Sequence, residues 1–171
     1  MGSSERCRVS GDLLEEIIDF GMQPLGNGFL DEIDYENEYF YNMKLGFNDS
    51  SKMAQLFFQP NPKKMFHEDY AFFSSTSLSM QEHFKKLYNF ILNSPYLLKV
   101  NPFVVEIGCN DGILLKHFAY EGINHLGIEP STNVAKIANR NGVKTISEFF
   151  NKNLAKDIVN ENGKANIVVS A

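Results

Sequence analysis

The sequence from Phe103 onward is constrained most strongly by a regular alternation of short apolar runs and helical segments. Each apolar run has the length and composition of a buried strand, and the segments between the runs have apolar side chains at helical spacing. Strands joined by helices over short connections form parallel sheets with right-handed crossovers. The alternation therefore predicts an α/β fold with four parallel strands. The expected strands are 103–107, 125–129, 144–146 and 165–169, and the expected helices are 111–120, 131–140 and 154–159.

The residues before this sheet differ in character. Residues 1–60 consist of short strand-like and turn-like pieces, and Pro24, Gly26, Asn27 and Gly28 mark an expected loop. An amphipathic helix is expected over 80–92, with Ser79 as its N-cap and Glu82 completing a capping box. The predicted domains are a small, mostly β module at 1–60, a linker and helix at 61–97, and the sheet domain at 98–171.

Charge and cysteine usage exclude several classes of protein. The formal net charge is −5 and Lys and Arg form no cluster, which argues against a nucleic-acid partner. No apolar run approaches the roughly 18 residues of a membrane-spanning helix, and the N-terminus lacks the apolar segment of a signal peptide. Only two cysteines occur, Cys7 and Cys109, which is too few for a disulfide framework. These features predict a cytoplasmic protein without a membrane partner.

The turn between the first strand and the first helix of the sheet carries the most informative motif, Glu106-Ile-Gly-Cys-Asn-Asp-Gly112. Gly108 permits a tight turn and lets a ligand approach the backbone closely. Asn110 tolerates a positive φ, so it can stand where a glycine is common. Asp111 is expected to cap the following helix, whose N–H groups would face the ligand.

A dinucleotide site is disfavoured by the same turn. Counted from Gly108, the Gly-x-Gly-x-x-Gly pattern meets Asn110 and Ile113 and keeps one glycine of three. A nicotinamide-dependent oxidoreductase is therefore the weaker enzyme hypothesis. The actual spacing, acid-x-Gly-x-Asn-x-Gly, resembles the first motif of Rossmann-like S-adenosylmethionine-dependent methyltransferases, in which no pyrophosphate has to be bound.

Two acidic residues add to this interpretation. Glu129 ends the second strand, 21 residues after Gly108, where an acid can accept hydrogen bonds from both ribose hydroxyls. Glu106 would lie near the cationic methionine end of the cofactor. Glu129 could instead only cap the helix that starts near Ser131. Cys109 is expected to be a small turn residue and not a nucleophile, because no adjacent base is visible for it.

The whole chain is similar to the N-terminal part of the sugar C-methyltransferase family. Members of this family join a small zinc-binding module, a Rossmann-like methyltransferase domain and a C-terminal domain. The similar stretches are 7–11, 19–30, 53–56, 69–75 with His83, 106–115, and 127–131. The resemblance implies a partial Rossmann-like sheet and S-adenosylmethionine as the cofactor. The implied cofactor-binding residues are Glu106, Gly108, Asn110, Asp111, Gly112, Glu129 and Ser131.

The resemblance also implies a small-molecule substrate, a nucleotide-linked keto-deoxysugar that is methylated on carbon. Tyr70 and His83 are the implied substrate-binding residues, although a structural or surface role is the default for His83, which lies on the linking helix. The family tends to carry a tyrosine near the position of Phe72, so a substrate-facing hydroxyl is expected to be absent here.

The N-terminal module departs from the family pattern of two Cys-x-x-Cys pairs that bind a structural zinc. The first pair is Cys7 and Ser10 in this chain, and the second is Asn48 and Ser51. One thiolate does not make a closed tetrahedral site, which takes about four Cys or His ligands. We therefore expect the module to keep its shape by packing, without zinc or another metal.

The family's active-site histidine and remaining strands would lie beyond Ala171, so the resemblance assigns no catalytic residue to this chain. The chain is expected to be a fragment of a methyltransferase. The alternative is a degenerate, non-catalytic remnant that binds a nucleotide or a protein. The fourth strand, with apolar residues at 167–169, is expected to form an exposed edge through which the chain self-associates.

Overall fold

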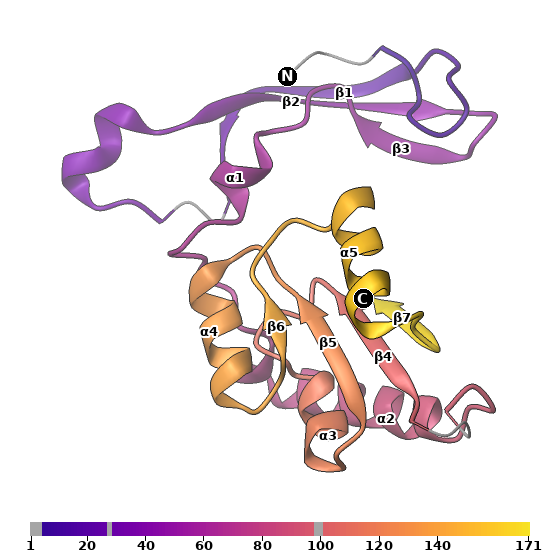
Figure 1. The fold of residues 1–171 in the computed structure, drawn as a ribbon. Helices are drawn as coiled ribbons and strands as arrows, with labels where there is room; N and C mark the ends of the chain where they lie inside the picture. Colours follow the sequence, from indigo (N-terminus) through magenta and orange to yellow (C-terminus); the bar gives the residue numbers. More distant parts are fainter. Residues whose placement is uncertain (1–4, 27–28, 98–100) are drawn as a thin grey trace. The chain divides into compact units, whose positions relative to one another are not determined.

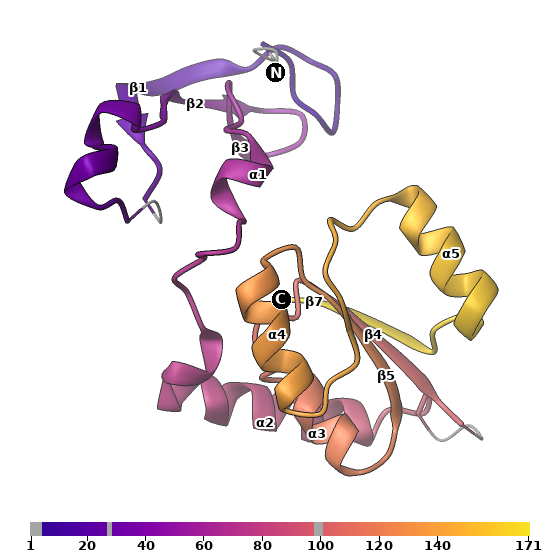
Figure 2. The same ribbon diagram turned by 60° about the vertical axis from the view of Figure 1, so that its left-hand side comes forward.

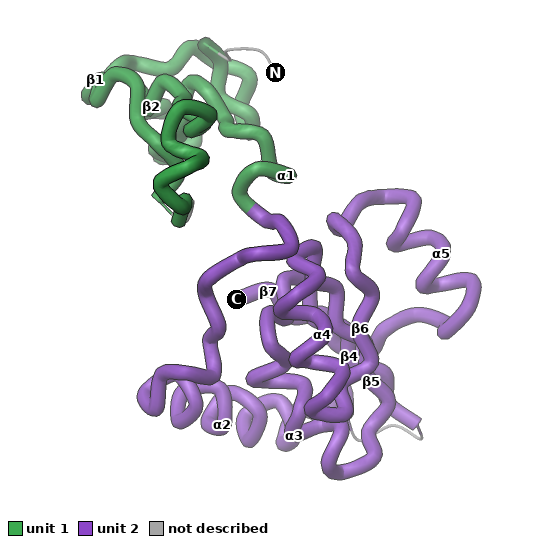
Figure 3. The backbone as a smooth tube through the Cα atoms, turned by 90° about the vertical axis from the view of Figure 1, so that its left-hand side faces the viewer, with its two compact units in different colours: residues 1–65 green, residues 66–171 purple. Residues whose placement is uncertain are grey.

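The computed structural model describes residues 5–26, 29–97 and 101–171, and the chain forms two compact units, residues 1–65 and residues 66–171 (Figure 3). In the loop expected around Pro24 to Gly28, Pro24 instead ends a strand, and Asn27 and Gly28 lie outside the described residues. No helix in the described ranges is long and apolar enough to cross a membrane.

Unit 1 is built on an antiparallel sheet with the strand order β1-β2-β3 (Figure 1). Its elements are β1 (Glu15–Pro24), the 3-10 helix η1 (Glu32–Asn37), β2 (Phe40–Asn48), β3 (Met53–Leu56) and the short helix α1 (Pro62–Met65). Cys7, Leu14 and Phe57 form its small core. Gly46 makes room for this core, because a Cβ there would stand 2.6 Å from the Phe57 ring. The expectation of a mostly β module is confirmed.

Unit 2 is a parallel sheet with helices between its strands. Its elements are η2 (Ser74–Thr76), α2 (Leu78–Leu92), β4 (Phe103–Ile107), α3 (Leu115–Tyr120), β5 (Asn124–Ile128), α4 (Thr132–Arg140), β6 (Thr145–Ile146), α5 (Lys152–Asn162) and β7 (Ile167–Ser170). The strand order is β6-β5-β4-β7, and all three pairings are parallel. The predicted α/β fold with a four-stranded parallel sheet is confirmed.

The sheet of unit 2 is covered on both faces, as a parallel sheet requires. Successive side chains of a strand point to opposite faces, so Val104 packs with Phe84 and Phe118 on one face, and Phe103 and Val105 pack on the other. The first face is covered by α2, α3 and α4, and the second by α5 (Figure 2). Helix α2 thus packs in the same core as the sheet, with its Tyr88 ring 4.9 Å from Phe118.

The starts of α2, α3 and α4 differ from the sequence-based expectation, and the segment expected at 154–159 lies inside the longer helix α5. Helix α3 begins at Leu115 and not at Asp111, because residues 111–114 form turns that lead into it. Helix α2 begins at Leu78 with Ser77 as its N-cap, whose hydroxyl accepts a hydrogen bond from the Met80 N–H. The expected cap at Ser79 was therefore wrong by two residues. Other serine and threonine residues nearby offer similar caps.

The strand order places a switch point at β4. From β4 the chain proceeds outward through β5 to β6 and then returns to the other side of β4 as β7. Ligands of open α/β sheets bind at the carboxyl ends of the strands at such a point. The turn that follows β4 is the turn that carries the Glu106–Gly112 motif.

Candidate functional site

The turn after β4 is fixed by backbone geometry that only some residues adopt. Gly108 has φ +74° and Asn110 has φ 50°, so the expected positive φ at Asn110 is confirmed. The N–H groups of Gly108 and Cys109 both donate to the carbonyl of Ile128, at 2.8 and 3.2 Å, which holds the turn against the end of β5. A Cβ at Gly108 would have no atom within 4 Å, so its outer side is open to a ligand.

Gly112 has a packing role instead. Its φ is +79°, and a Cβ there would stand 2.8 Å from Cγ2 of Val143 and 3.3 Å from the Cβ of Ala138. A glycine at this position lets the turn lie close to α4 and the residues that follow it. Gly112 therefore shapes the site from inside the core.

Asn110 and Asp111 direct their side chains to the segment that precedes α2. Asn110 accepts a hydrogen bond from the Ser74 N–H at 2.8 Å and donates one to the Phe72 carbonyl at 3.1 Å. Asp111 accepts from the Ser75 N–H at 2.9 Å and from the Ser75 hydroxyl at 2.5 Å. The expectation that Asp111 caps the following helix was wrong, because its carboxyl group binds Ser75. These bonds fasten residues 72–75 across the turn.

Glu129 connects the end of β5 to both neighbouring turns. Its Oε2 accepts a hydrogen bond from the Asn110 N–H at 3.1 Å, and its Oε1 accepts one from the Ser131 N–H at 2.8 Å. The side chain is 5% exposed. Ser131 is the N-cap residue of α4, so the contact expected from the capping alternative is present. A carboxyl oxygen has two lone pairs, and each oxygen of Glu129 keeps capacity for a ligand donor.

Glu106 lies at the end of β4 with a carboxyl oxygen that lacks a partner. The side chain is 2% exposed, and its Oε2 has no hydrogen-bond partner among the described residues. Burial, and next the charge of Asp111, raise the pKa of Glu106 to about 8. Oδ1 of Asp111 and the hydroxyl of Ser131 are likewise buried without a partner in the described chain. Buried unpaired polar atoms are costly, and Glu106 lines a cavity, so its free oxygen indicates a site for a polar ligand.

Two cavities open on either side of Gly108. The larger, about 340 Å³, is lined by Glu106, Cys109, Phe72, His83 and by Ala171, which follows β7. The smaller, about 200 Å³, is lined by Glu129 and by mostly apolar side chains. Its apolar lining residues are Phe66, Ile107, Ile128, Pro130, Phe149 and Phe150.

Gly108 borders both cavities. An elongated ligand can therefore extend from an apolar cavity, across the exposed backbone of one glycine, to a cavity that ends on a buried acid.

Of the two residues implied for substrate binding, His83 lines a described cavity and Tyr70 does not. His83 lines the larger cavity, where its ring contacts the Phe84 ring at a centroid distance of 5.3 Å. Tyr70 lies toward the smaller cavity, because its ring is 5.5 Å from Phe66. Partial burial, and next the charge of Glu129, raise the pKa of Tyr70. The structure does not bring Tyr70 and His83 together.

Cys109 is 1% exposed and its side chain packs against Gly127, where a Cβ would collide with its sulfur. Burial, and next the charge of Glu106, raise the pKa of the Cys109 thiol far above its usual range. A protonated, enclosed thiol is a poor nucleophile. The geometry agrees with the expectation of a small turn residue.

The aromatic wall of the smaller cavity and the role of Ser75 were not expected from the sequence. Phe149 and Phe150 follow the short strand β6, and the ring of Phe149 lies 6.3 Å from that of Phe66. The signal was present, because an aromatic pair shortly after the carboxyl end of a parallel strand is expected near the ligand edge. Ser75 gave no such signal, since its partner is 36 residues away.

Comparison with known proteins finds one matching family model and a relative along most of the chain. Residues 7–66 match the family Methyltransf_13, described as "Putative zinc binding domain". The C-methyltransferase NovU of Streptomyces niveus is 29% identical to the chain over 166 residues, which cover 96% of the chain. Both matches support a relationship to the sugar C-methyltransferase family. It spans 39% of the length of NovU.

A solved structure also resembles part of the chain. The magnesium protoporphyrin IX methyltransferase ChlM of Synechocystis PCC 6803, a structure with bound SAH, is 16% identical. The similarity covers 53% of this chain and 41% of ChlM, with a TM-score of 0.38. A likeness of that size has no bearing on the ligand of this chain.

Proposed function

We propose that unit 2 binds S-adenosylmethionine and serves a methyltransferase that acts on carbon of a small molecule. The observation that carries this proposal is the pair of cavities that share Gly108, one apolar and beside Glu129, the other ending on Glu106. S-adenosylmethionine is a nucleoside with a cationic amino-acid arm, so its adenine ring would suit the apolar cavity and its cationic arm would suit the cavity with Glu106. A dinucleotide would instead need a glycine-rich turn for its pyrophosphate.

Each residue of the site would have a distinct task. Phe66 and Phe149 would contact the adenine ring, and Glu129 would accept hydrogen bonds from the ribose hydroxyls. Gly108 would let the ribose approach the backbone. Glu106 would lie near the ammonium and sulfonium charges, which favour its ionised form.

The remaining residues of the predicted site would hold its shape. Asn110 and Asp111 would act through the bonds that fasten residues 72–75, and Gly112 through its packing on Val143. The unpartnered hydroxyl of Ser131 is available to the ligand or to an ordered water. These assignments make Asn110, Asp111 and Gly112 positioning residues.

We further propose a nucleotide-linked keto-deoxysugar as the substrate, with His83 at the substrate end of the larger cavity. When bound, the cofactor supplies an electrophilic methyl group. Carbon methylation next to a ketone also needs a base that removes a proton from that carbon. We assign this base to none of the described residues, and Tyr70, whose ring contacts Phe66, is better placed near the adenine end.

Calorimetric titration of the 171-residue chain tests the proposal. S-adenosylmethionine and S-adenosylhomocysteine are expected to bind more tightly than NAD, because the turn lacks the glycines that a pyrophosphate requires. Equal affinity for NAD would contradict the assignment. Absence of binding by all three would favour the non-catalytic, protein-binding alternative.

A further inference from the structure

Two turns of unit 1 share one geometry. In the first turn, the Ser10 N–H donates to the sulfur of Cys7 at 3.5 Å, and Gly11 follows with φ +81°. In the second, the Ser51 N–H donates to Oδ1 of Asn48 at 2.8 Å, and Lys52 follows with φ 56°. In each turn, the N–H of the fourth residue therefore donates to the side chain of the first residue, and the fifth residue has a positive φ.

The side chains at the first and fourth positions of both turns meet. The Cys7 sulfur and the Ser51 hydroxyl are 3.2 Å apart, and the Ser10 hydroxyl donates to Oδ1 of Asn48 at 3.0 Å. Four thiolates around a zinc ion, with bonds of about 2.3 Å, stand about 3.8 Å from one another. The four positions thus converge almost as the ligands of one tetrahedral ion would.

The groups present at these positions do not fit zinc. They are one thiol, two hydroxyls and one carboxamide, whereas structural zinc sites take about four Cys or His ligands. Among the described residues, no group of three or more His, Cys, Asp or Glu could hold a metal ion. The chain thus departs from the zinc-binding character that the family description assigns to residues 7–66.

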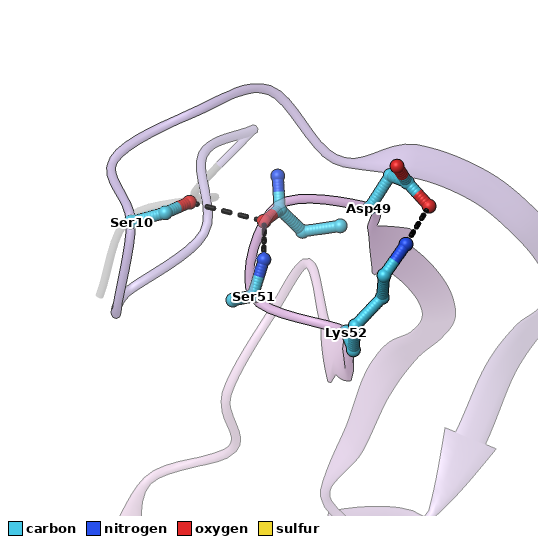
Figure 4. Close-up of polar contacts among 5 residues, drawn as sticks. Ser10, Asp49, Ser51 and Lys52 are labelled. Carbon is cyan, nitrogen blue, oxygen red and sulfur yellow. Dashed lines mark hydrogen bonds and ion pairs between the residues drawn. The ribbon is translucent and has the colours of Figure 1, made fainter.

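We propose that the carboxamide of Asn48 replaces a metal ion as the cross-link between the two turns, so that unit 1 holds its fold without zinc. The oxygen of Asn48 accepts hydrogen bonds from Ser10 of the first turn and from Ser51 of the second (Figure 4). Its Nδ2 donates to the Leu13 carbonyl at 3.0 Å. The side chain is 3% exposed, so these bonds are made out of water, where a lost partner is costly.

Gln55 adds a second connection to the first turn. Its Nε2 donates to the Cys7 sulfur at 2.8 Å, and its Oε1 accepts from the Arg8 N–H at 3.0 Å. The first turn is thereby bound both to the second turn through Asn48 and to strand β3 through Gln55. The pair Asp49–Lys52 is exposed and lies at the outside of the second turn (Figure 4).

Both turns bring the side chains of their first and fourth positions together, as a tetrahedral metal site requires. Cysteines at positions 10, 48 and 51 would complete a four-thiolate set with Cys7. The triple substitution S10C/N48C/S51C is therefore expected to create a zinc site.

Amide hydrogen exchange of the 171-residue chain tests the cross-link. In Asn48→Ala, the N–H of Ser51 is expected to exchange at least tenfold faster, and amides around Leu14 are expected to lose protection with it. Asp49→Ala is the matched control, because it changes the neighbouring exposed residue of the same turn and is expected to leave the rates unchanged. Equal rates in Asn48→Ala and the unsubstituted chain would overturn the proposal.

Metal content tests the same proposal independently. The unsubstituted chain is expected to hold much less than one zinc per chain and to show the same exchange rates with and without a chelator. The triple variant is expected to bind one zinc per chain and to lose exchange protection when the chelator is added. Stoichiometric zinc in the unsubstituted chain, lost on Cys7→Ala, would overturn the proposal. A folded triple variant without zinc would overturn the claim that the turns retain a metal-site geometry.

Discussion

Oε2 of Glu129 accepts a hydrogen bond from the backbone N–H of Asn110 at 3.1 Å, although 19 residues separate the two in sequence. The carboxyl ends of parallel neighbouring strands meet at one edge of the sheet, so the acid that ends β5 reaches the turn that follows β4. The contact places an acidic group at the border of the apolar cavity and beside the open face of Gly108.

Substitution of this acid tests the ribose assignment. Glu129→Ala is expected to weaken S-adenosylmethionine binding by about 1–3 kcal/mol, the range for lost hydrogen bonds to a charged group. Glu161→Ala, at an exposed position on α5, is the control and is expected to leave binding unchanged. Calorimetry on both variants measures the effect, and unchanged affinity in Glu129→Ala would remove Glu129 from the site.

Glu106 predicts a pH dependence of binding. Its pKa is raised to about 8, so below that pH the free protein holds this carboxyl group protonated. A cationic ligand favours the ionised form, and the affinity for S-adenosylmethionine is therefore expected to rise with pH up to about 8, with proton release at pH 7.

Calorimetry in buffers of different ionisation enthalpy measures this proton release. In Glu106→Gln the proton release should vanish and the affinity should become flat between pH 6 and pH 8. A pH dependence that persists in Glu106→Gln would show that another group titrates on binding.

Two glycines offer a matched pair for the close approach of the ligand. Gly108 has φ +74° and Gly122 has φ +69°, and a Cβ at either would meet no atom within 4 Å. Alanine at each is expected to cost about 1 kcal/mol of unfolding free energy because of the left-handed backbone. Only Gly108→Ala is expected to weaken ligand binding, since only Gly108 borders the cavities. Denaturant unfolding and calorimetry measure the two effects, and equal binding by the two variants would argue against a ligand above Gly108.

The bonds between Ser75 and Asp111 are expected to hold residues 72–75 in place. Asp111→Ala is expected to lower the unfolding free energy by about 2 kcal/mol, because it removes two hydrogen bonds to a buried acid. Ser75→Ala removes only one of them, and the double variant should be less destabilised than the sum of the two. Thr76→Ala, which loses only a local bond to Phe73, is the control. Additive effects of Ser75→Ala and Asp111→Ala would show that the two do not interact.

Strand β7 predicts self-association of the 171-residue chain. β7 pairs with β4 on one side and is an edge strand of the sheet, and its Val168 is 60% exposed. Edge strands pair readily with other chains, and lysine on an edge suppresses this pairing. Sedimentation is expected to show concentration-dependent association that Val168→Lys abolishes. Val159→Lys, at an exposed position on α5, should leave it unchanged, and a monomer at all concentrations would refute the prediction.

The local sequence pattern predicted the bounds of the strands of unit 2 to within two residues. β4 (Phe103–Ile107) matches its expected bounds, because a short run that is apolar except for Glu106, and that is bounded by turn residues, fits a buried parallel strand. The positive φ of Asn110 was likewise predictable from residue type. The expected cap at Asp111 was wrong. Its residue type suits a helix start, but its carboxyl group accepts a hydrogen bond from Ser75 instead.

The sequence by itself determined the order and type of the elements, the turn between β4 and α3, and the pair of acids at the strand ends. These depend on side-chain periodicity and on backbone preferences that act within a few residues. Only the tertiary structure decided that Asn110 and Asp111 bind the segment before α2, that two cavities meet at Gly108, and that Asn48 connects two turns of unit 1. Ser75 and Asp111 are 36 positions apart in the sequence, and Ser10 and Asn48 are 38 positions apart. Several polar side chains could have made each contact, and the packing of the cores selects which of them meet.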